Sequence, residues 1–516
     1  MSSTTMNGAL KRSAVDRTKP PLALVTLTVM LGALMAVIDT SIVNVALDTM
    51  AGNLGASPDE IGWVATGYIL SQVIIMPLNG WLTARFGRRN LYAASLVVFT
   101  VGSFLCGTAT GIGSLVFYRL IQGIGGGALQ PTAQAILMES YPPERRAAAV
   151  AIFGVGVIVG PAIGPVLGGY FIDNYSWPLI FYVNIPIGIV AVIMTILYIR
   201  QAPSSTQREG SPIDVVALGL LTIWLAPLQY VLQEGQRLDW FSDDTIVILT
   251  TISVLAMVAF VIRELRDPNP LVDLRIFHWR AFSAGNLISL ISGFGLYGTA
   301  LILPLFLQNL LGFTPTDAGL ALIPGSIATM VSLQIASRAM RYIDARVLIA
   351  GGLGIFAVGA WWMGALNQYA GYWDVFWPRA LQGFALGFLF VPLTTATLSE
   401  IPNALMAGAT GIYSLVRQLG GSLGIAVLLF LQDRFEDVAQ SGIASSVTLG
   451  NPNVANAVQH QGLSLFGLYA MVTTNATVIS YDMVLRLCGI VFAVSIPFVL
   501  LLRVNANAPP VSAGEI

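Results

Sequence analysis

Long apolar segments alternate with short polar ones along most of this chain. At about 20 residues each, the apolar segments are long enough to cross a hydrocarbon layer about 30 Å thick as α-helices. The predicted helices are at residues 22–47, 60–82, 91–109, 114–138, 148–170, 178–199, 213–234, 244–262, 281–308, 317–337, 347–366, 374–398, 405–431 and 481–502. The pattern therefore predicts an all-α polytopic membrane protein with fourteen transmembrane helices.

Basic residues are distributed unevenly between the two sides of these helices. With the N-terminus in the cytoplasm, nineteen of the 25 Lys and Arg residues fall on inner segments and three on outer segments. Cytoplasmic loops of membrane proteins are enriched in basic residues. We therefore expect a multi-pass protein of the cell (inner) membrane with both termini in the cytoplasm.

A short motif occurs twice and indicates how the chain is organised. Residues 117–123 read FYRLIQG and residues 377–383 read WPRALQG, 260 positions later. Such a repeat indicates two related halves of six helices, as in many secondary transporters, with two extra central helices between them. The predicted domains are a cytoplasmic N-terminal tail (1–21), an N-terminal half (22–199), a linker with two inserted transmembrane helices (200–280), a C-terminal half (281–502) with an outer loop at 432–480, and a cytoplasmic tail (503–516).

The composition excludes several classes of function. The chain is 55% hydrophobic and 10% charged, and its net charge of −1 gives no indication of nucleic-acid binding. Lysine occurs only at Lys11 and Lys19, in the N-terminal tail, so this chain alone is not an ATP-driven pump with a Walker A lysine. The histidines, His278 and His460, lie in separate loops. We therefore expect no metal, no cofactor and no enzymatic activity.

Asp39 and Arg119 are predicted to form an ion pair inside the membrane. A guanidinium in hydrocarbon costs at least about 2.5 kcal/mol and marks a functional site by default. At about 1.5 Å per residue, Asp39 lies ~25 Å above the inner start of its helix. Arg119 lies ~22 Å above the inner edge of the hydrocarbon layer, so the two side chains are at similar depth. Burial favours the neutral carboxyl group and the guanidinium favours the carboxylate, so the pair can act as a proton switch. The alternative is a static pair that only positions helices.

The second copy of the motif differs from the first. Arg379 has no acidic residue at the corresponding depth, which favours a structural role, in contact with backbone carbonyls or Gln382. Arg417 lies near mid-membrane in another helix, and cavity lining and packing are equally compatible with it. The G-x-S-x-G pattern at residues 420–424 lacks a histidine in any span, so we interpret it as helix packing.

Polar and aromatic residues on the first, second and fourth helices and on their repeats are candidates for a substrate cavity. Residues of these types belong to the packed core more often than to a ligand site. The candidates are Tyr68, Gln72, Tyr118, Gln122, Gln130, Gln382, Tyr413 and Arg417. A cavity with aromatic rings and few charges suits bulky amphipathic or weakly cationic compounds.

Two further motifs point to gating or packing. The first follows the second predicted helix and contains Gly80, Arg85, Gly87, Arg88 and Arg89, which either lock the inner face or reflect ordinary membrane topology. The second lies on the fifth predicted helix and contains Gly156, Gly160, Pro161, Gly164, Pro165 and Gly168. Its glycines let another helix approach closely and its prolines bend the helix. Tight packing and a seal between the halves are both compatible with it.

Taken together and in this order, these residues resemble the major facilitator superfamily, and within it the fourteen-span drug:proton antiporters of the EmrB/QacA group. The resemblance runs from about residue 22 to residue 431 and includes residues 38–47, which read IDTSIVNVAL. It also includes the loop at Gly80, the motif at Arg119 and the glycine–proline helix. The superfamily's gating motif normally has an acid at the position of Ala84, so a charge lock that needs it is not expected here.

The resemblance implies the major facilitator fold and a proton-coupled antiporter that exports drugs or other amphipathic small molecules by alternating access. Its implied partners are a small-molecule substrate, protons and the lipid bilayer. A periplasmic adaptor and an outer-membrane channel are also implied if the cell has two membranes. The alternative is a proton-coupled carrier of a specific metabolite or lipid-like compound on the same fold.

Overall fold

The computed structural model describes residues 20–200, 213–448, 451, 454 and 464–502, and within these ranges its regular structure consists of helices. Residues 1–19 of the predicted N-terminal tail, the linker at 201–212 and the predicted C-terminal tail at 503–516 lie outside the described residues. The helices follow from the apolar composition, because a backbone in hydrocarbon must satisfy its hydrogen bonds within its own segment.

The N-terminal half contains the long helices predicted for it, with two interruptions. Its helices are α1 (Leu22–Leu54), α2 (Pro58–Ile75), α3 (Asn79–Phe86), α4 (Arg88–Gly107), α5 (Ile112–Ser140), α6 (Pro143–Asn174), α7 (Leu179–Tyr182) and α8 (Asn184–Tyr198). Ser57 and Glu60 form a capping box at the start of α2. Gly87, with a φ of 74°, separates α3 from α4, a conformation that glycine adopts without strain.

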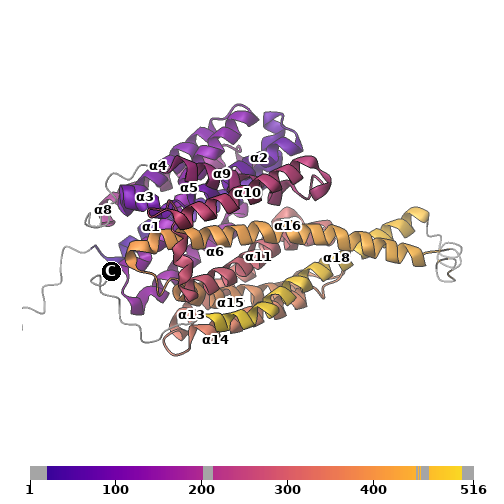
Figure 1. The fold of residues 1–516 in the computed structure, drawn as a ribbon. Coiled ribbons are helices and arrows are strands. Elements are labelled where there is room, and N and C mark those ends of the chain that lie inside the picture. The colour runs from indigo at the N-terminus through magenta and orange to yellow at the C-terminus, as the bar shows by residue number, and fades with distance from the viewer. Residues whose placement is uncertain (1–19, 201–212, 449–450, 452–453, 455–463, 503–516) are drawn as a thin grey trace, which may run out of the picture.

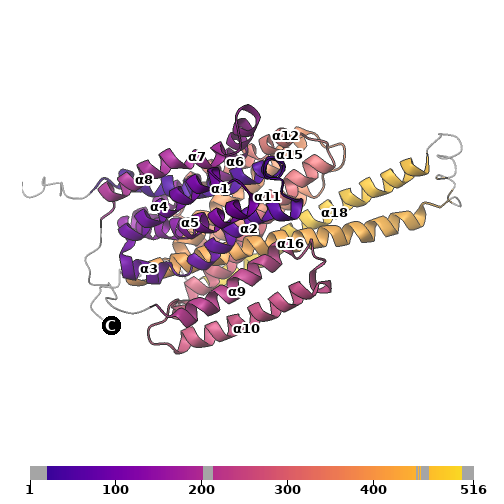
Figure 2. The same cartoon turned by 90° about the horizontal axis from the view of Figure 1, so that it is seen from above.

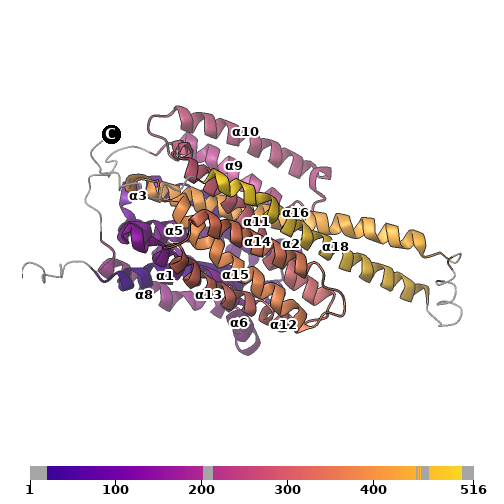
Figure 3. The same ribbon diagram turned by 90° about the horizontal axis from the view of Figure 1, so that it is seen from below.

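The inserted pair consists of α9 (Val215–Glu234) and α10 (Asp244–Arg266). Asp214 and Asp243 cap these helices by accepting hydrogen bonds from backbone N–H groups of the first turn. Short 3-10 turns, η3 (Trp240–Ser242) and η4 (Leu274–His278), lie before α10 and after it. The pair packs together at one side of the bundle, as Figures 2 and 3 show.

The C-terminal half repeats the arrangement of long helices. Its elements are α11 (Arg280–Asn309), α12 (Pro315–Leu320), α13 (Ile323–Ala339), α14 (Ala345–Met363), α15 (Tyr372–Thr397), η5 (Asn403–Leu405), α16 (Met406–Ser446), α18 (Leu465–Ser495) and η6 (Ile496–Leu501). Figure 1 shows this half, in rose, orange and yellow, beside the indigo and purple N-terminal half.

Each of the fourteen predicted spans coincides with a helix or a pair of helices. Among the described residues, twelve helices are long and apolar enough to cross a membrane, and a thirteenth span results if α2 and α3, bent by 64°, are counted as one. The helix α6, at the fifth predicted span, has 32 residues but is not one of these. The all-helical polytopic fold is confirmed, whereas the count of fourteen stays a prediction.

The predicted outer loop at residues 432–480 is wrong over most of its length. The helix α16 continues to Ser446 and α18 begins at Leu465, so the two form a long hairpin that projects beyond the other helices (Figure 1). The content of Ser, Asn, Ala and Gly in this segment suggested a loop. However, the hydroxyls of Ser441, Ser445 and Ser446 donate to backbone carbonyls three residues back, so these side chains are satisfied within the helix.

The two halves meet along a seam formed mainly by α5 and α6 on one side and α13, α15 and α16 on the other. One cluster of buried apolar residues, which includes Phe306, Phe356 and Phe492, lies within the C-terminal half. Another crosses the seam and joins Val150 of α6 to Leu333 of α13. We call the end of the bundle that carries α3 the α3 end. The α16–α18 hairpin projects from the opposite end (Figure 1).

Candidate functional site

Asp39 of α1 and Arg119 of α5 form a buried ion pair, as their depths predicted. The Nη1 of Arg119 lies 2.5 Å from Oδ2 of Asp39, and the side chains are 1% and 0% exposed. A charge removed from water is stable only when it is paired and its remaining hydrogen-bonding atoms are satisfied. The neighbours of this pair therefore decide whether it persists as two ions.

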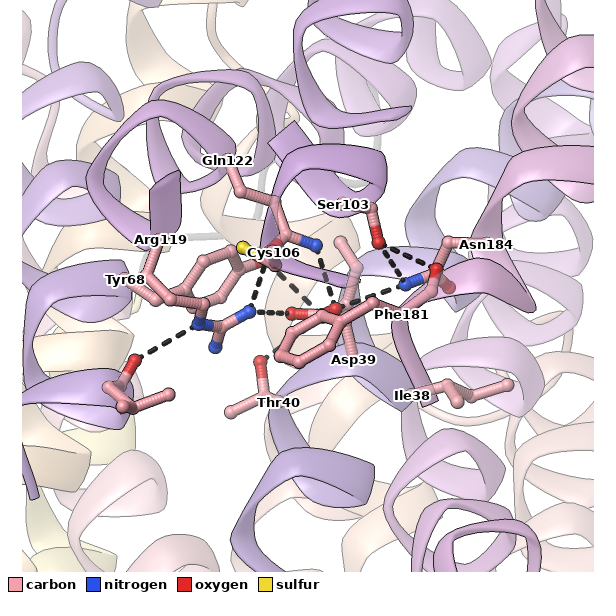
Figure 4. Close-up of polar contacts among 12 residues, drawn as sticks. Ile38, Asp39, Thr40, Tyr68, Ser103, Cys106, Arg119, Gln122, Phe181 and Asn184 are labelled. Carbon is pink, nitrogen blue, oxygen red and sulfur yellow. Dashed lines mark hydrogen bonds and ion pairs between the residues drawn. The ribbon is translucent and has the colours of Figure 1, made fainter. Parts of the chain in front are cut away.

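Three neighbouring residues complete the hydrogen bonding of the pair (Figure 4). Gln122 and Asn184 each donate an amide N–H to Oδ1 of Asp39, at 2.7 Å and 3.0 Å. Arg119 donates from Nε to the carbonyl oxygen of Val64 at 3.0 Å and from Nη1 to Oε1 of Gln122 at 2.8 Å. The carboxylate is thus held by donors from α5 and α8 together. The ion pair and its hydrogen bonds therefore link four helices, α1, α2, α5 and α8.

Aromatic rings enclose the ion pair. The guanidinium carbon of Arg119 lies 4.2 Å from the centre of the Tyr68 ring and 5.8 Å from that of Phe181. A cation over a ring face is attracted by about 0.5–2 kcal/mol, with the larger values in desolvated sites. Tyr68 is itself fully buried and packs edge-on against Phe99. Arg119 therefore has favourable contacts that do not depend on the charge of Asp39.

The glycine stripe of α6 packs on the turn of α1 that carries Asp39. An added methyl group at Gly164 would overlap the Ser41 hydroxyl, and one at Gly160 would lie 2.7 Å from Val37. The Ser41 hydroxyl also donates to the carbonyl of Gly160 at 3.4 Å. The stripe packs closely on α1 of its own half. Gly154 faces Phe390 and Leu333 across the seam instead.

Arg379 has no carboxylate partner among the described residues, in contrast to Arg119. Its Nη1 donates to Oε1 of Gln382 at 3.4 Å, while its Nε has no hydrogen-bond partner in the described part of the chain. It is 8% exposed and packs closely against Gly325 of α13. The predicted contact between Arg379 and Gln382 is present. The two copies of the motif therefore place their arginines in different electrostatic surroundings.

A pocket lies beside the seam at Arg417. Its cavity volume is about 30 Å³, room for a small headgroup, and it opens to solvent on one side. Its lining residues are Ser289, Ser292, Leu296, Leu386, Leu389, Phe390, Leu393, Tyr413 and Arg417. Across the seam, Arg417 donates to Oε1 of Gln130 at 3.4 Å. The guanidinium also lies 5.4 Å from the ring centre of Phe390 and 5.9 Å from that of Tyr413.

The eight predicted cavity residues separate into different environments. Tyr413 and Arg417 line the pocket, and Gln130 contacts Arg417. Gln382 is buried beside Arg379. The remaining four are on the N-terminal side, where Gln122 contacts the ion pair, Tyr68 stacks on Arg119, Gln72 lies beside Gly126 and Tyr118 packs against a buried apolar cluster.

The arginines of the predicted gating motif form no charge lock across the seam in the described part of the chain. Arg88 pairs with Glu139 and Arg89 donates to the carbonyl of Ile196, both within the N-terminal half, whereas Arg85 is exposed. The contacts across the seam come from Gly80 of the motif and from Asn79 before it. A methyl group at Gly80 would lie 2.9 Å from Cα of Gly408.

Asn79 provides the polar contact across the seam at this end. Its Nδ2 donates to the carbonyl of Ala407 at 2.9 Å, and its Oδ1 accepts from Thr132 at 2.7 Å. Neither Asn79 nor Asn184 is among the site residues predicted from the sequence. The available signal was an asparagine next to Gly80 in the first case and an asparagine within an apolar span in the second.

The comparisons with known proteins agree with this architecture. The model of the Major Facilitator Superfamily matches residues 29–425. The chain is 36% identical over 501 residues to the multidrug export protein EmrB of Escherichia coli K12, covering 96% of each chain. It is 34% identical to the fatty acid resistance protein FarB of Neisseria gonorrhoeae, covering 96% of this chain and 97% of that one.

Solved structures show the same fold at low sequence identity. The human organic anion transporter MFSD10 is 13% identical with a TM-score of 0.61, and the match covers 92% of this chain and 100% of that one. The proton:xylose symporter XylE is 16% identical with a TM-score of 0.57, and the match covers 91% of this chain and 94% of that one. At these identities the likeness concerns the fold alone.

Proposed function

The chain belongs to the major facilitator superfamily of membrane transporters, and from this premise we propose that it exports drugs or other amphipathic small molecules in exchange for protons, by alternating access. The observation that carries the proposal is the buried Asp39–Arg119 pair, a titratable group within the membrane whose partners lie on several helices. The names of the relatives EmrB and FarB, a multidrug export protein and a fatty acid resistance protein, support export as the direction.

Proton binding to Asp39 is the proposed coupling step. The ionised carboxylate holds Arg119, Gln122 and Asn184 together, and protonation removes its charge. Arg119 then keeps the Val64 carbonyl and the Tyr68 ring as partners, so it is not left without favourable contacts. The helix α1 becomes free to shift against α5 and α8. A proton thereby changes the relative stability of two arrangements of the N-terminal half.

The proposed substrate cavity lies at the seam, where Gln130 of one half meets Arg417 and Tyr413 of the other. The candidates on the N-terminal side, Tyr68, Gln72, Tyr118 and Gln122, would link an occupied cavity to the ion pair, since Gln122 contacts Asp39 directly. Gln382 would stay with Arg379. Substrate and proton then compete through one connected set of polar groups.

We further propose that the α3 end faces the cytoplasm, with the protein in the cell (inner) membrane and both termini cytoplasmic. The basic residues Arg85, Arg88 and Arg89 lie at that end, as the positive-inside rule requires. The α16–α18 hairpin then points away from the cytoplasm. If the cell has two membranes, a periplasmic adaptor and an outer-membrane channel are the proposed partners.

The test is Asp39→Asn in proteoliposomes, with Asp48→Asn as a matched control on the exposed face of the same helix. Exchange of a fluorescent substrate driven by a pH gradient is expected to fall to the rate of empty liposomes in Asp39→Asn and to persist in Asp48→Asn. Substrate–substrate exchange without a gradient is measured in parallel, because a folded but uncoupled protein retains it. Gradient-driven exchange by Asp39→Asn at the wild-type rate would refute the coupling role.

A further inference from the structure

Arg417 carries a positive charge that no acidic side chain neutralises among the described residues. It is 8% exposed, lies on α16 at the seam, and has Gln130 as its polar partner at 3.4 Å. A long contact to a neutral amide compensates a buried guanidinium poorly, because removing a charge from water costs several kcal/mol unless an opposite charge replaces the water. The positive charge of Arg417 therefore favours the binding of an anion in this pocket.

Two hydroxyl groups without partners in the described part of the chain line the pocket, and a third lies on the helix that carries Arg417. Ser289 and Ser292 lie one turn apart on α11 and line the pocket, and neither hydroxyl has a hydrogen-bond partner in the described part of the chain. Ser289 is fully buried. Ser414, one turn before Arg417 on α16, is 2% exposed, and its hydroxyl likewise has no partner there. Buried polar groups are nearly always satisfied, so these hydroxyls indicate a ligand with acceptor oxygens.

The rest of the pocket is apolar. Leu386, Leu389, Phe390 and Leu393 of α15 form one wall, and Leu296 of α11 adds to it. Among the nine lining residues, Arg417 is the one that carries a charge. A cationic compound would meet no carboxylate there, because Asp39 is fully buried and already bonded to Arg119, Gln122 and Asn184.

We infer that this pocket binds amphipathic substrates with one anionic headgroup, a carboxylate or a sulfonate. Arg417 binds the headgroup, Ser289 and Ser292 donate to its oxygens, and the apolar body packs against α15. The inference rests on the proposed export function and replaces the weakly cationic compounds expected from the sequence. It also links substrate to the seam, because the headgroup competes with Gln130 for the guanidinium.

The test compares three fluorescent probes that share a dansyl-labelled undecyl body and end in a carboxylate, a carboxamide or an ammonium group. Binding is measured at neutral pH in phosphatidylcholine nanodiscs without a proton gradient. The wild type is expected to bind the carboxylate at least about tenfold more tightly than the other two, as a charge-assisted hydrogen bond provides. Arg417→Gln is expected to lose this preference, and Arg417→Lys to keep part of it.

Two further variants are controls for unfolding and for non-specific effects of charge. Arg434→Gln removes an exposed arginine from the same helix and should leave the preference unchanged. The double variant Ser289→Ala, Ser292→Ala leaves the charge in place and should weaken carboxylate binding while the carboxamide still binds. If Arg417→Gln fails to fold, the serine variant tests the same headgroup contacts.

The outcomes separate the two proposals. If wild type binds none of the probes, the substrate site and the export proposal both fail. If it binds all three equally, or prefers ammonium, the anionic inference fails while export stands.

Repeating the titration with phosphatidylglycerol in the nanodiscs separates an exported amphiphile from a resident lipid. Equal carboxylate binding in both lipids supports the inference, and its loss in phosphatidylglycerol would assign the pocket to lipid and overturn it.

Discussion

The Asp39 carboxylate is held in the bundle by three side chains. Arg119 supplies the opposite charge, and Gln122 and Asn184 complete the hydrogen bonding of the carboxylate. The sequence could predict the pair, since one acid and one arginine at equal depth each require a partner. It could not predict Asn184, because whether an asparagine in an apolar span points inward depends on packing between helices distant in sequence.

Asn184→Ala tests how far the pair depends on that neutral donor. Removing a hydrogen bond to a charged group costs about 1.5–3 kcal/mol, and the Ser103 hydroxyl loses its donor as well. We expect a lower thermal unfolding temperature and slower gradient-driven exchange. Asn174→Ala is the control, because this exposed asparagine bonds only to the carbonyl of Tyr170 within its own helix. Equal losses in the two variants would show that Asn184 has no special role at the pair.

At the scale of helices, the position of α1 is set by the small residues of α6. The i, i+4 glycines predicted a close approach, yet they could not identify the approaching helix. The structure shows that it is α1, at Val37, Ser41 and Ile42, so the stripe positions the helix that carries Asp39. At residues 432–480 the sequence predicted the wrong type of element. Composition suggested a loop, but helical hydrogen bonding extends through it to Ser446.

Gly164→Ala and Gly169→Ala test this packing as a matched pair on one helix. A methyl group at Gly164 overlaps the Ser41 hydroxyl and lies 2.9 Å from the backbone nitrogen of Ile42, whereas nothing lies within 4 Å of one at Gly169. Overpacking costs about 1–3 kcal/mol. We expect Gly164→Ala to unfold at a lower temperature and to exchange substrate more slowly, and Gly169→Ala to resemble wild type. The opposite ranking would contradict the packing role of the stripe.

On the scale of the whole molecule, polar contacts join the two halves at several places in the described part of the chain, and the bond of Arg417 to Gln130 is one of them. The helix α9 bonds to both, because Gln233 accepts from Thr66 of α2 and Gln229 donates to Ser422 of α16. Asn79 and Ala407 connect the halves at the α3 end although they are 328 positions apart. The repeated motif predicted two halves. It could not predict these contacts, because they depend on how one half docks against the other.

Asn79→Leu should shift the molecule toward arrangements in which the α3 end is open. The variant removes the hydrogen bond to Ala407, and a bond of this kind contributes about 0.5–1.5 kcal/mol, which corresponds to a roughly 2- to 10-fold change in population. Thr132→Val is the control, since it removes the Asn79–Thr132 bond within one half and leaves the contact across the seam.

Pulsed electron paramagnetic resonance can measure this shift. Spin labels at Phe86 and Tyr342 replace exposed residues, 50% and 87% accessible, from opposite halves at the α3 end, while both native cysteines are buried and remain unlabelled. In Asn79→Leu the longer distances should gain population, and in Thr132→Val they should change less. If both variants gain the same population, the effect arises within the N-terminal half. The contact between Asn79 and Ala407 then does not hold the two halves together, and the backbone approach of Gly80 to Gly408 remains as the contact that closes this end.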